Sequence, residues 1–122
     1  MRFNAGGTID GTFGSHGGVV SSFSGFFEAS TSPLAIQTNG DIVAAGSATT
    51  GGTSPTGSFA LARYLSTGNL DTTFGTEGLV TTGFGNGVTA SVAALVIQTD
   101  GKIVAAGSDS VGNLVVARYL GQ

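Results

Sequence analysis

The sequence has no cysteine, no tryptophan and a single histidine, His16. Without cysteine, disulfide bonds and thiolate metal sites are excluded. One histidine cannot form the multi-imidazole sites that hold most transition metals. Its counterpart in the second half of the chain is Glu77, so we expect His16 to be an exposed loop residue. The sequence therefore predicts no metal and no cofactor.

Charged residues are also scarce, at 9% of the chain, and the net charge is −3. Nucleic-acid binding needs a basic face, which four lysines and arginines cannot build. No run of about 18 apolar residues is present, so we expect no membrane span. Residues 1–6 lack the apolar core of a signal peptide. We therefore expect either an intracellular protein or a segment cut from a longer exported one.

Helical patterns are missing as well. Apolar residues do not recur at helical spacing for more than one turn, and the 122 residues include 22 glycines but only two prolines. Glycine is unfavourable inside helices and useful in tight turns. These features predict one all-β domain with many turns.

The sequence does contain an internal repeat. Residues 36–47 and 97–108 are 61 positions apart and agree at ten of twelve positions. Each copy has two apolar runs joined by Asn-Gly or Asp-Gly, which is typical of a β-hairpin with a two-residue type I′ turn. We expect the hairpin strands at residues 33–38 and 41–47, and again at 94–99 and 102–108.

The repeat extends on both sides of the hairpin. Residues 2–17 match 63–78 as a turn-rich connector, and a short strand at 18–23 matches 79–84. A last strand at 58–64 matches 113–119, now 55 positions later because the loop at 48–57 is six residues longer. We expect two units, at about 1–61 and about 62–122, with four short strands each.

Several strands are small or apolar on both faces, which predicts sheets covered on both sides. Four-stranded antiparallel sheets stacked in this way are the blades of a β-propeller. The small residues at 44–46 and 105–107 suit a close approach near a crowded axis.

The repeated motifs resemble those of the delta-60 repeat family. They read Asp-x-x-Phe-Gly-x-x-Gly, then Gln-x-Asn/Asp-Gly-x-Ile-Val-Ala-Ala-Gly-Ser, then Ala-Arg-Tyr. The resemblance covers nearly the whole chain. It implies propeller-like blades of bacterial, often surface or secreted, proteins, and it implies no catalytic residues. The matching residues are Asp10, Phe13, Gly14, Gln37, Gly40, Arg63 and Tyr64, and then Asp71, Phe74, Gly75, Gln98, Gly101, Arg118 and Tyr119.

Two blades do not close a propeller, which needs about four to eight. Two apolar sheet faces would stay bare, which is unusual for a soluble monomer. We therefore expect association, either as a cyclic trimer with six blades, as a tetramer with eight, or as a head-to-tail filament. A fragment of a longer propeller is the remaining alternative.

The connectors contain the candidate structural residues. We expect Asp10 and Asp71 to stabilise turns, and Phe13 and Phe74 to plug the core beneath them. Arginine recurs at the end of a strand, where a buried guanidinium needs a carboxylate or carbonyl partner. The alternatives are a calcium site at the aspartates, or an arginine ring open to an anionic ligand. The recurring arginines are Arg2, Arg63 and Arg118.

Phe26 and Phe27 have no aromatic counterpart in the second repeat. We expect them to cover the core. If one is exposed, their loop, with Glu28 and the matching Asn86, becomes the first candidate for recognition.

The sequence contains neither a nucleophile elbow nor a phosphate-binding loop. It predicts a non-enzymatic structural or binding protein. A carbohydrate-binding, lectin-like ring is one alternative, although the absence of tryptophan counts against it. A filament or surface-layer subunit is the other.

Overall fold

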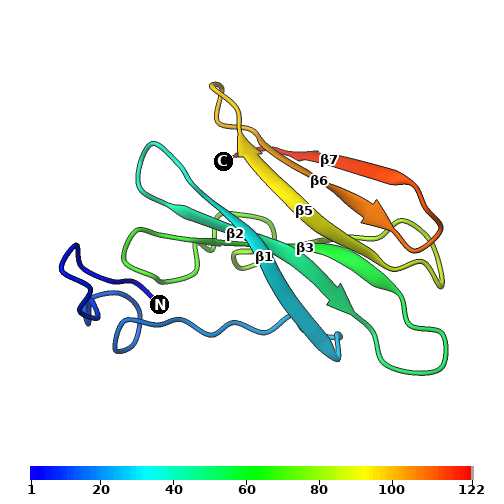
Figure 1. Cartoon of the computed structure of the whole chain (residues 1–122), viewed down its shortest axis with the longest axis horizontal. Coiled ribbons are helices and arrows are strands. Elements are labelled where there is room, and N and C mark those ends of the chain that lie inside the picture. Colours follow the sequence, from blue (N-terminus) through cyan, green and yellow to red (C-terminus); the bar gives the residue numbers. More distant parts are fainter. Residues whose placement is uncertain (122) are drawn as a thin grey trace.

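The computed structural model describes residues 1–121, in which the regular elements are seven β-strands (Figure 1). The all-β fold class is confirmed. The described residues contain no helix with the length and apolar character needed to cross a membrane. The strands are β1 (Glu28–Ile36), β2 (Ile42–Thr49), β3 (Gly57–Tyr64), β4 (Leu79–Thr82), β5 (Ala90–Ile97), β6 (Ile103–Asp109) and β7 (Leu114–Tyr119).

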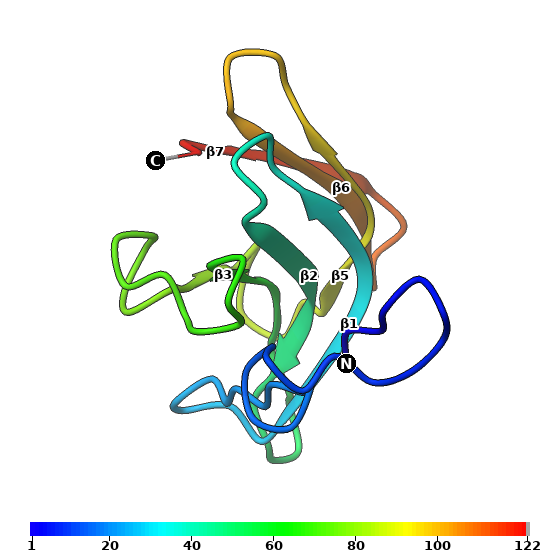
Figure 2. The same cartoon turned by 90° about the vertical axis from the view of Figure 1, so that its left-hand side faces the viewer.

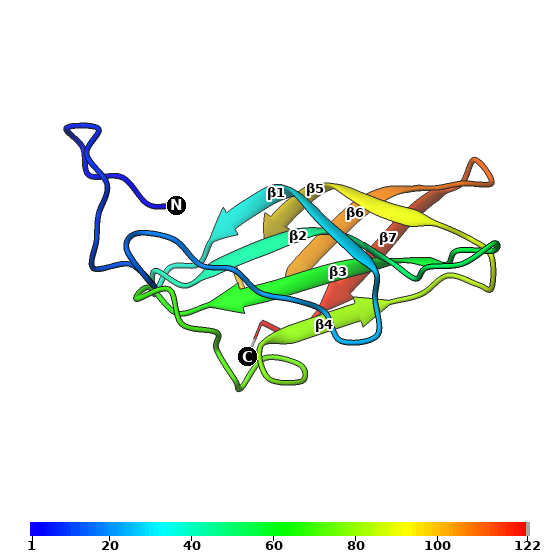
Figure 3. The ribbon, with the colours of Figure 1, turned by 90° about the horizontal axis from the view of Figure 1, so that it is seen from below.

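The strands form two antiparallel sheets, one ordered β1-β2-β3-β4 and the other β5-β6-β7. Strand β4 belongs by sequence to the second repeat, yet it pairs with β3 of the first, with Leu61 opposite Val80. Figure 3 shows β4 running beside β3 at the edge of this sheet. The boundary between the two sheets, after β4, therefore lies inside the second repeat and not between the repeats.

The strand expected at residues 18–23 is not formed. Gly18 makes one isolated bridge with Ser15, and residues 19–23 have no strand pairing with the described residues. Its match, β4, pairs because β3 precedes it and offers an open edge. The described residues before position 18 contain no such strand. The second sheet has three strands where the repeat pattern predicts four, because β4, the remaining expected strand of the second repeat, pairs with β3.

The hairpin turns differ from the predicted two-residue type. Gln37 N–H donates to Asp41 O at 2.8 Å, and Gly40 N–H donates to Gln37 O at 2.9 Å, so the loop has three residues. Only Gly40 has a positive φ, of 88°, and Gly101 in the second hairpin has 83°. This is the turn-plus-bulge hairpin, in which one glycine takes the left-handed conformation. The prediction of a hairpin is confirmed, and the prediction of its turn type is wrong.

The pattern expected of a type I′ turn occurs in the connectors instead. His16 and Gly17 have φ of 54° and 85°, and the matching Glu77 and Gly78 have 53° and 92°. In the first connector, Ser15 and Gly18 close the turn by exchanging backbone hydrogen bonds. His16 is exposed on this turn.

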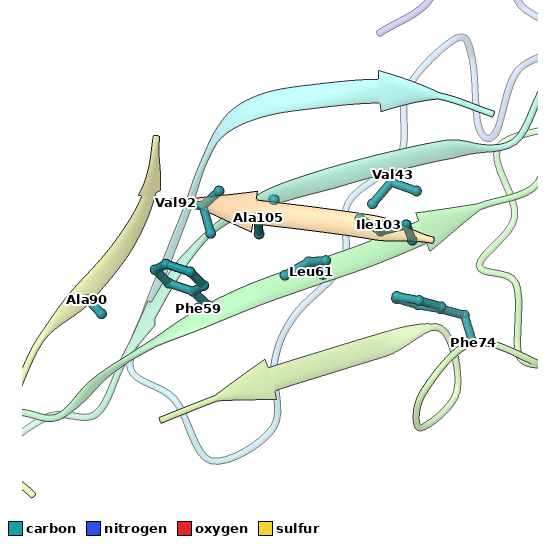
Figure 4. Close-up of a cluster of buried hydrophobic side chains, with 9 residues drawn as sticks. Val43, Phe59, Leu61, Phe74, Ala90, Val92, Ile103 and Ala105 are labelled. Atoms are coloured by element: carbon teal, nitrogen blue, oxygen red, sulfur yellow. The ribbon is translucent and has the colours of Figure 1, made fainter. Parts of the chain in front are cut away.

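The two sheets pack face to face, with β5 lying across β1, β2 and β3 (Figures 1 and 2). The core between them takes alternate residues of the central strands (Figure 4). Phe59 also meets Phe84 edge to face, with ring centroids 4.9 Å apart. The core residues are Val43, Ala45, Phe59 and Leu61 from the first sheet, Ala90, Val92, Ile103 and Ala105 from the second, and Phe74 from the connector.

Gly46 in β2 and Gly107 in β6 each lie beside an irregularity in the neighbouring strand. A Cβ atom on Gly46 would collide with the carbonyl oxygen of Ser30, and one on Gly107 with that of Ser91. The glycine of the repeated Ala-Ala-Gly run is thus required within the sheet, by a bulged neighbouring strand. The nearest atoms belong to that strand and not to a central axis.

We expect Gly46→Ala to lower the free energy of unfolding by about 1–3 kcal/mol, because the methyl group must push β1 away from β2. Gly6→Ala is the matched control, since no atom lies within 4 Å of its Cβ position. It should change stability by about 0.5 kcal/mol or less. Urea denaturation measures both. Equal effects of the two substitutions would contradict the close approach.

Candidate functional site

The second connector is organised around a buried ion pair. Arg63 Nε donates to Asp71 Oδ2 at 2.8 Å, and Arg63 Nη2 lies 2.7 Å from the same oxygen. The side chains are only 4% and 9% exposed. The guanidinium also lies 4.7 Å from the ring centroid of Phe74, and Arg63 Nη1 donates to the carbonyl of Gly121. One arginine thus joins a strand end, the following turn and the end of the next repeat.

The first connector repeats this arrangement nearer the surface. Arg2 Nε donates to Asp10 Oδ2 at 2.8 Å, and the guanidinium lies 4.7 Å from the ring centroid of Phe13. Arg2 Nη1 donates to Ser66 O at 2.6 Å. Ser66 matches Gly121, since both lie three residues after the arginine that ends their repeat. The two connectors therefore make the same set of contacts.

Both aspartates also hold their own turns. The Thr73 hydroxyl donates to Asp71 Oδ1 at 2.6 Å, and this bond, together with the Thr73 amide and Arg63, holds the pKa of Asp71 below its usual value against the effect of burial. Thr12 lowers the pKa of Asp10 in the same way, with Arg2 contributing less. Both side chains are committed to structural contacts as carboxylates.

Arg118 is the third arginine of the series, and it differs from the others. It is exposed on β7, and it makes no side-chain hydrogen bond or ion pair with any residue from 1 to 121. By position Arg118 matches Arg63, whose partner Asp71 follows eight residues later in the sequence.

The recognition residues expected from the sequence lie at the start of β1 and in the loop between β4 and β5, at the end of the sheets away from the connectors (Figure 1). Phe27 N–H donates to Thr49 O at 2.9 Å. Gly87, next to Asn86, donates to Thr56 Oγ1 at 3.1 Å. The loops before β1, between β2 and β3, and between β4 and β5 therefore lie next to one another.

Phe27 is 86% exposed, so the expectation that it covers the core is wrong. The neighbouring Phe26 is half-buried and lines an open groove of about 730 Å³. The groove lies between residues 20–26 and residues 75–81, and Glu77 is one of the residues that line it. Glu28 and Asn86 are exposed. The aromatic pair was predictable from the sequence, but the groove depends on the path of residues 20–26, of which residues 20–23 were expected to form a strand.

No group of three or more His, Cys, Asp or Glu side chains that could hold a metal occurs among residues 1–121. Ser15 Oγ lies 3.2 Å from Nδ1 of His16. Both side chains are exposed on the tight turn, outside the groove.

The outer face of the second sheet is apolar and bare. Its register places Leu114, Val116 and Arg118 on one side of β7. We call these three residues the β7 face. Leu114 is 91% exposed and Val116 is 65% exposed, whereas the matching Phe59 and Leu61 in the first repeat are fully buried.

The first sheet has a complementary bare face. Leu34 and Ile36 of β1 point away from the core and are exposed, and we call them the β1 face. Their matches in the second repeat, Leu95 and Ile97, pack against the core between the sheets. Each of these exposed apolar residues thus matches a residue that is packed against the core in the other repeat.

We expect Asp71→Ala to cost about 3–5 kcal/mol of stability, because it leaves the Arg63 guanidinium buried without its partner. Asp10→Ala removes the same contact near the surface and should cost clearly less. Urea unfolding of the two variants measures the difference. Equal losses would show that burial of the second pair is unimportant.

Stability should also fall in acid. The folded-state pKa of Asp71 lies below its unfolded value of about 4, so its contribution is complete above that pH and is lost as the pH falls through the lower, folded value. The loss should begin as the pH falls through about 4 and should be smaller in Asp71→Ala. An unchanged slope in the variant would contradict the assignment.

The chain matches the model of a known protein family. A family model described as a domain of unknown function (DUF5122), beta-propeller, matches residues 37–74 and 98–121, just over half of the chain. Both matched segments begin at the same point of the hairpin, at Gln37 and Gln98. No curated protein and no solved structure matches the chain.

Proposed function

The chain belongs to the DUF5122 β-propeller family, and we propose that it is a non-enzymatic scaffold that completes a propeller by homo-oligomerisation. The observation that carries this proposal is the pair of bare faces. Phe59 and Leu61 are buried, while the matching Leu114 and Val116 are exposed. Burying such side chains in a neighbouring subunit is favourable by about 25 cal/mol per Å² of apolar area. We further propose that the repeats are of the delta-60 type.

A non-enzymatic role is supported by the contacts of three of the seven acidic residues. Asp71 and Asp10 bind arginines and turn amides, and Asp109 binds the turn at Asn113. The pKa of each of these carboxyl groups is lowered by the hydrogen bonds it accepts. A general acid needs the opposite shift, towards neutral pH.

Assembly is tested by the mass of the particle in solution. Because the two bare faces differ, contact between copies is head to tail, and such contacts close into a ring or continue as a filament. We expect a discrete particle of three or four chains, which supplies six or eight blades. Size-exclusion chromatography with light scattering measures the mass, and electron microscopy distinguishes a ring from a fibre. A uniform monomer across a dilution series contradicts the proposal.

A second candidate function is ligand recognition at the loop end, with carbohydrate as the ligand class. It is favoured by the exposure of Phe27 and by the adjoining groove, whose volume of about 730 Å³ is typical of small-molecule sites. An exposed aromatic ring offers a flat apolar surface for the apolar face of a sugar.

For this candidate we expect retention of at least one glycan on an array, with a loss of about tenfold in Phe27→Ala. The ring is exposed, so its removal should leave the fold intact. Phe3→Ala is the matched control, because Phe3 is an exposed phenylalanine in the N-terminal connector. Absence of any glycan binding, or equal loss in both variants, rejects the carbohydrate function.

A further inference from the structure

The pairing of β3 with β4 shows how this fold completes a sheet. The last strand of one repeat takes its edge partner from the next repeat, with Phe59 opposite Thr82 and Leu61 opposite Val80. In the second repeat, β7 matches β3 and has no such partner among residues 1–121. Residues 18–21 match β4 and are not paired with any strand of the described chain. Within residues 1–121, the edge of β7 and the segment at residues 18–21 therefore both lack a strand partner. They match β3 and β4, which pair with each other.

Residues 18–21 lie against the first sheet in the way that β4 lies against the second sheet. Tyr64 Oη donates to Ser21 Oγ at 2.9 Å, which holds the segment against the first sheet. The matching pair, Tyr119 and Thr82, bonds at 2.8 Å and holds β4 against the second sheet. The two segments therefore make the same contact, each with the tyrosine that ends the last strand of its own repeat.

We propose that β7 of one copy pairs with residues 18–21 of a second copy, so that the β7 face covers the β1 face. This inference rests on the proposed function and names its interface. The register of β3 and β4, carried to the matching positions, places Leu114 opposite Ser21 and Val116 opposite Val19. The occupant is a second copy because the segment that fits β7 is present in this chain, without a strand partner and held in place.

The connector contacts imply that one arginine replaces another when two copies assemble. Residues 1–4 match residues 117–120, so Arg2 stands where Arg118 of the donating copy belongs. The backbone agrees, because Arg2 N–H donates to Gly17 O at 2.8 Å, as Arg63 N–H donates to Gly78 O at 2.9 Å. On assembly, Arg118 displaces Arg2 from Asp10 and from the ring of Phe13. One ion pair replaces another, and the gain is the burial of Leu114 and Val116.

Cysteine pairs test the register directly, since the chain has no cysteine of its own. Directly opposed residues of antiparallel strands lie about 4.5–5.5 Å apart between Cα atoms, which a disulfide can bridge. We expect Ser21→Cys with Leu114→Cys to form a ladder of covalent multimers on oxidation. Val20→Cys with Leu114→Cys is the control, because Val20 points to the opposite face. Equal cross-linking in the two pairs, or none in either, overturns the register.

Charge substitutions test the apolar contact without disturbing the single chain. Val116→Lys should shift the particle to monomer, because it buries a charge in the interface. Val111→Lys is the control, because Val111 is similarly exposed, at 70% against 65% for Val116, but lies in the loop between β6 and β7. Far-UV circular dichroism checks that both variants fold. Assembly that survives Val116→Lys overturns the inference.

The exchange of arginines predicts effects of opposite sign. Arg2→Ala frees Asp10 for the incoming arginine and should favour the assembled state, whereas Arg118→Ala should weaken it. Sedimentation equilibrium measures both association constants. Equal weakening by the two substitutions contradicts the exchange.

The outcomes separate this interface from the proposed function. A chain that assembles without the Ser21–Leu114 cross-link, and that tolerates Val116→Lys, is a homo-oligomer with another interface. A chain that stays monomeric under all conditions removes both proposals. Pairing of β7 only with a further repeat fused to its end also rejects the second copy as the occupant.

Discussion

The fold depends on one constraint, which is that a strand at a sheet edge needs a partner for its backbone N–H and C=O groups. The first sheet meets this need with β4, which the following repeat supplies. Within residues 1–121, the same rule leaves β7 with an open edge and residues 18–21 without a strand partner. The difference between four strands in one sheet and three in the other is thus a consequence of repeat order, and it locates the proposed interface.

Two kinds of contact link the repeats, and both are directional. The sheets share a core in which Phe59 and Leu61 face Val92 and Ile103. At the connector end, Arg63 ties the second turn to the carbonyl of Gly121, as Arg2 ties the first to Ser66. Each contact reaches from one repeat to the next in the same sense, which is the direction that the proposed head-to-tail assembly requires.

Much of this fold could be predicted from the sequence. The repeat spacing located both hairpins, and the run at 58–64 located β3 within one residue. The turn type could not be predicted, because Asn39-Gly40 is compatible both with a two-residue turn and with the three-residue loop and bulge that the structure has. The prediction of a strand at 18–23 was wrong although these residues have a strand-like sequence. A strand also needs a free edge to pair with, and none of the described residues before position 18 form a strand that supplies one. The exposure of Phe27 likewise depended on the path of a loop without a counterpart.

The sequence by itself determined the repeat, the all-β class and the turn-forming connectors, because these depend on residue type and spacing along the chain. Only the tertiary structure decided which repeat completes which sheet and which equivalent residues stay bare. Leu114 and Phe59 occupy matching positions, and nothing local distinguishes an exposed side chain from a buried one there. Burial depends on whether a neighbouring sheet is present, and that is a property of the packed molecule.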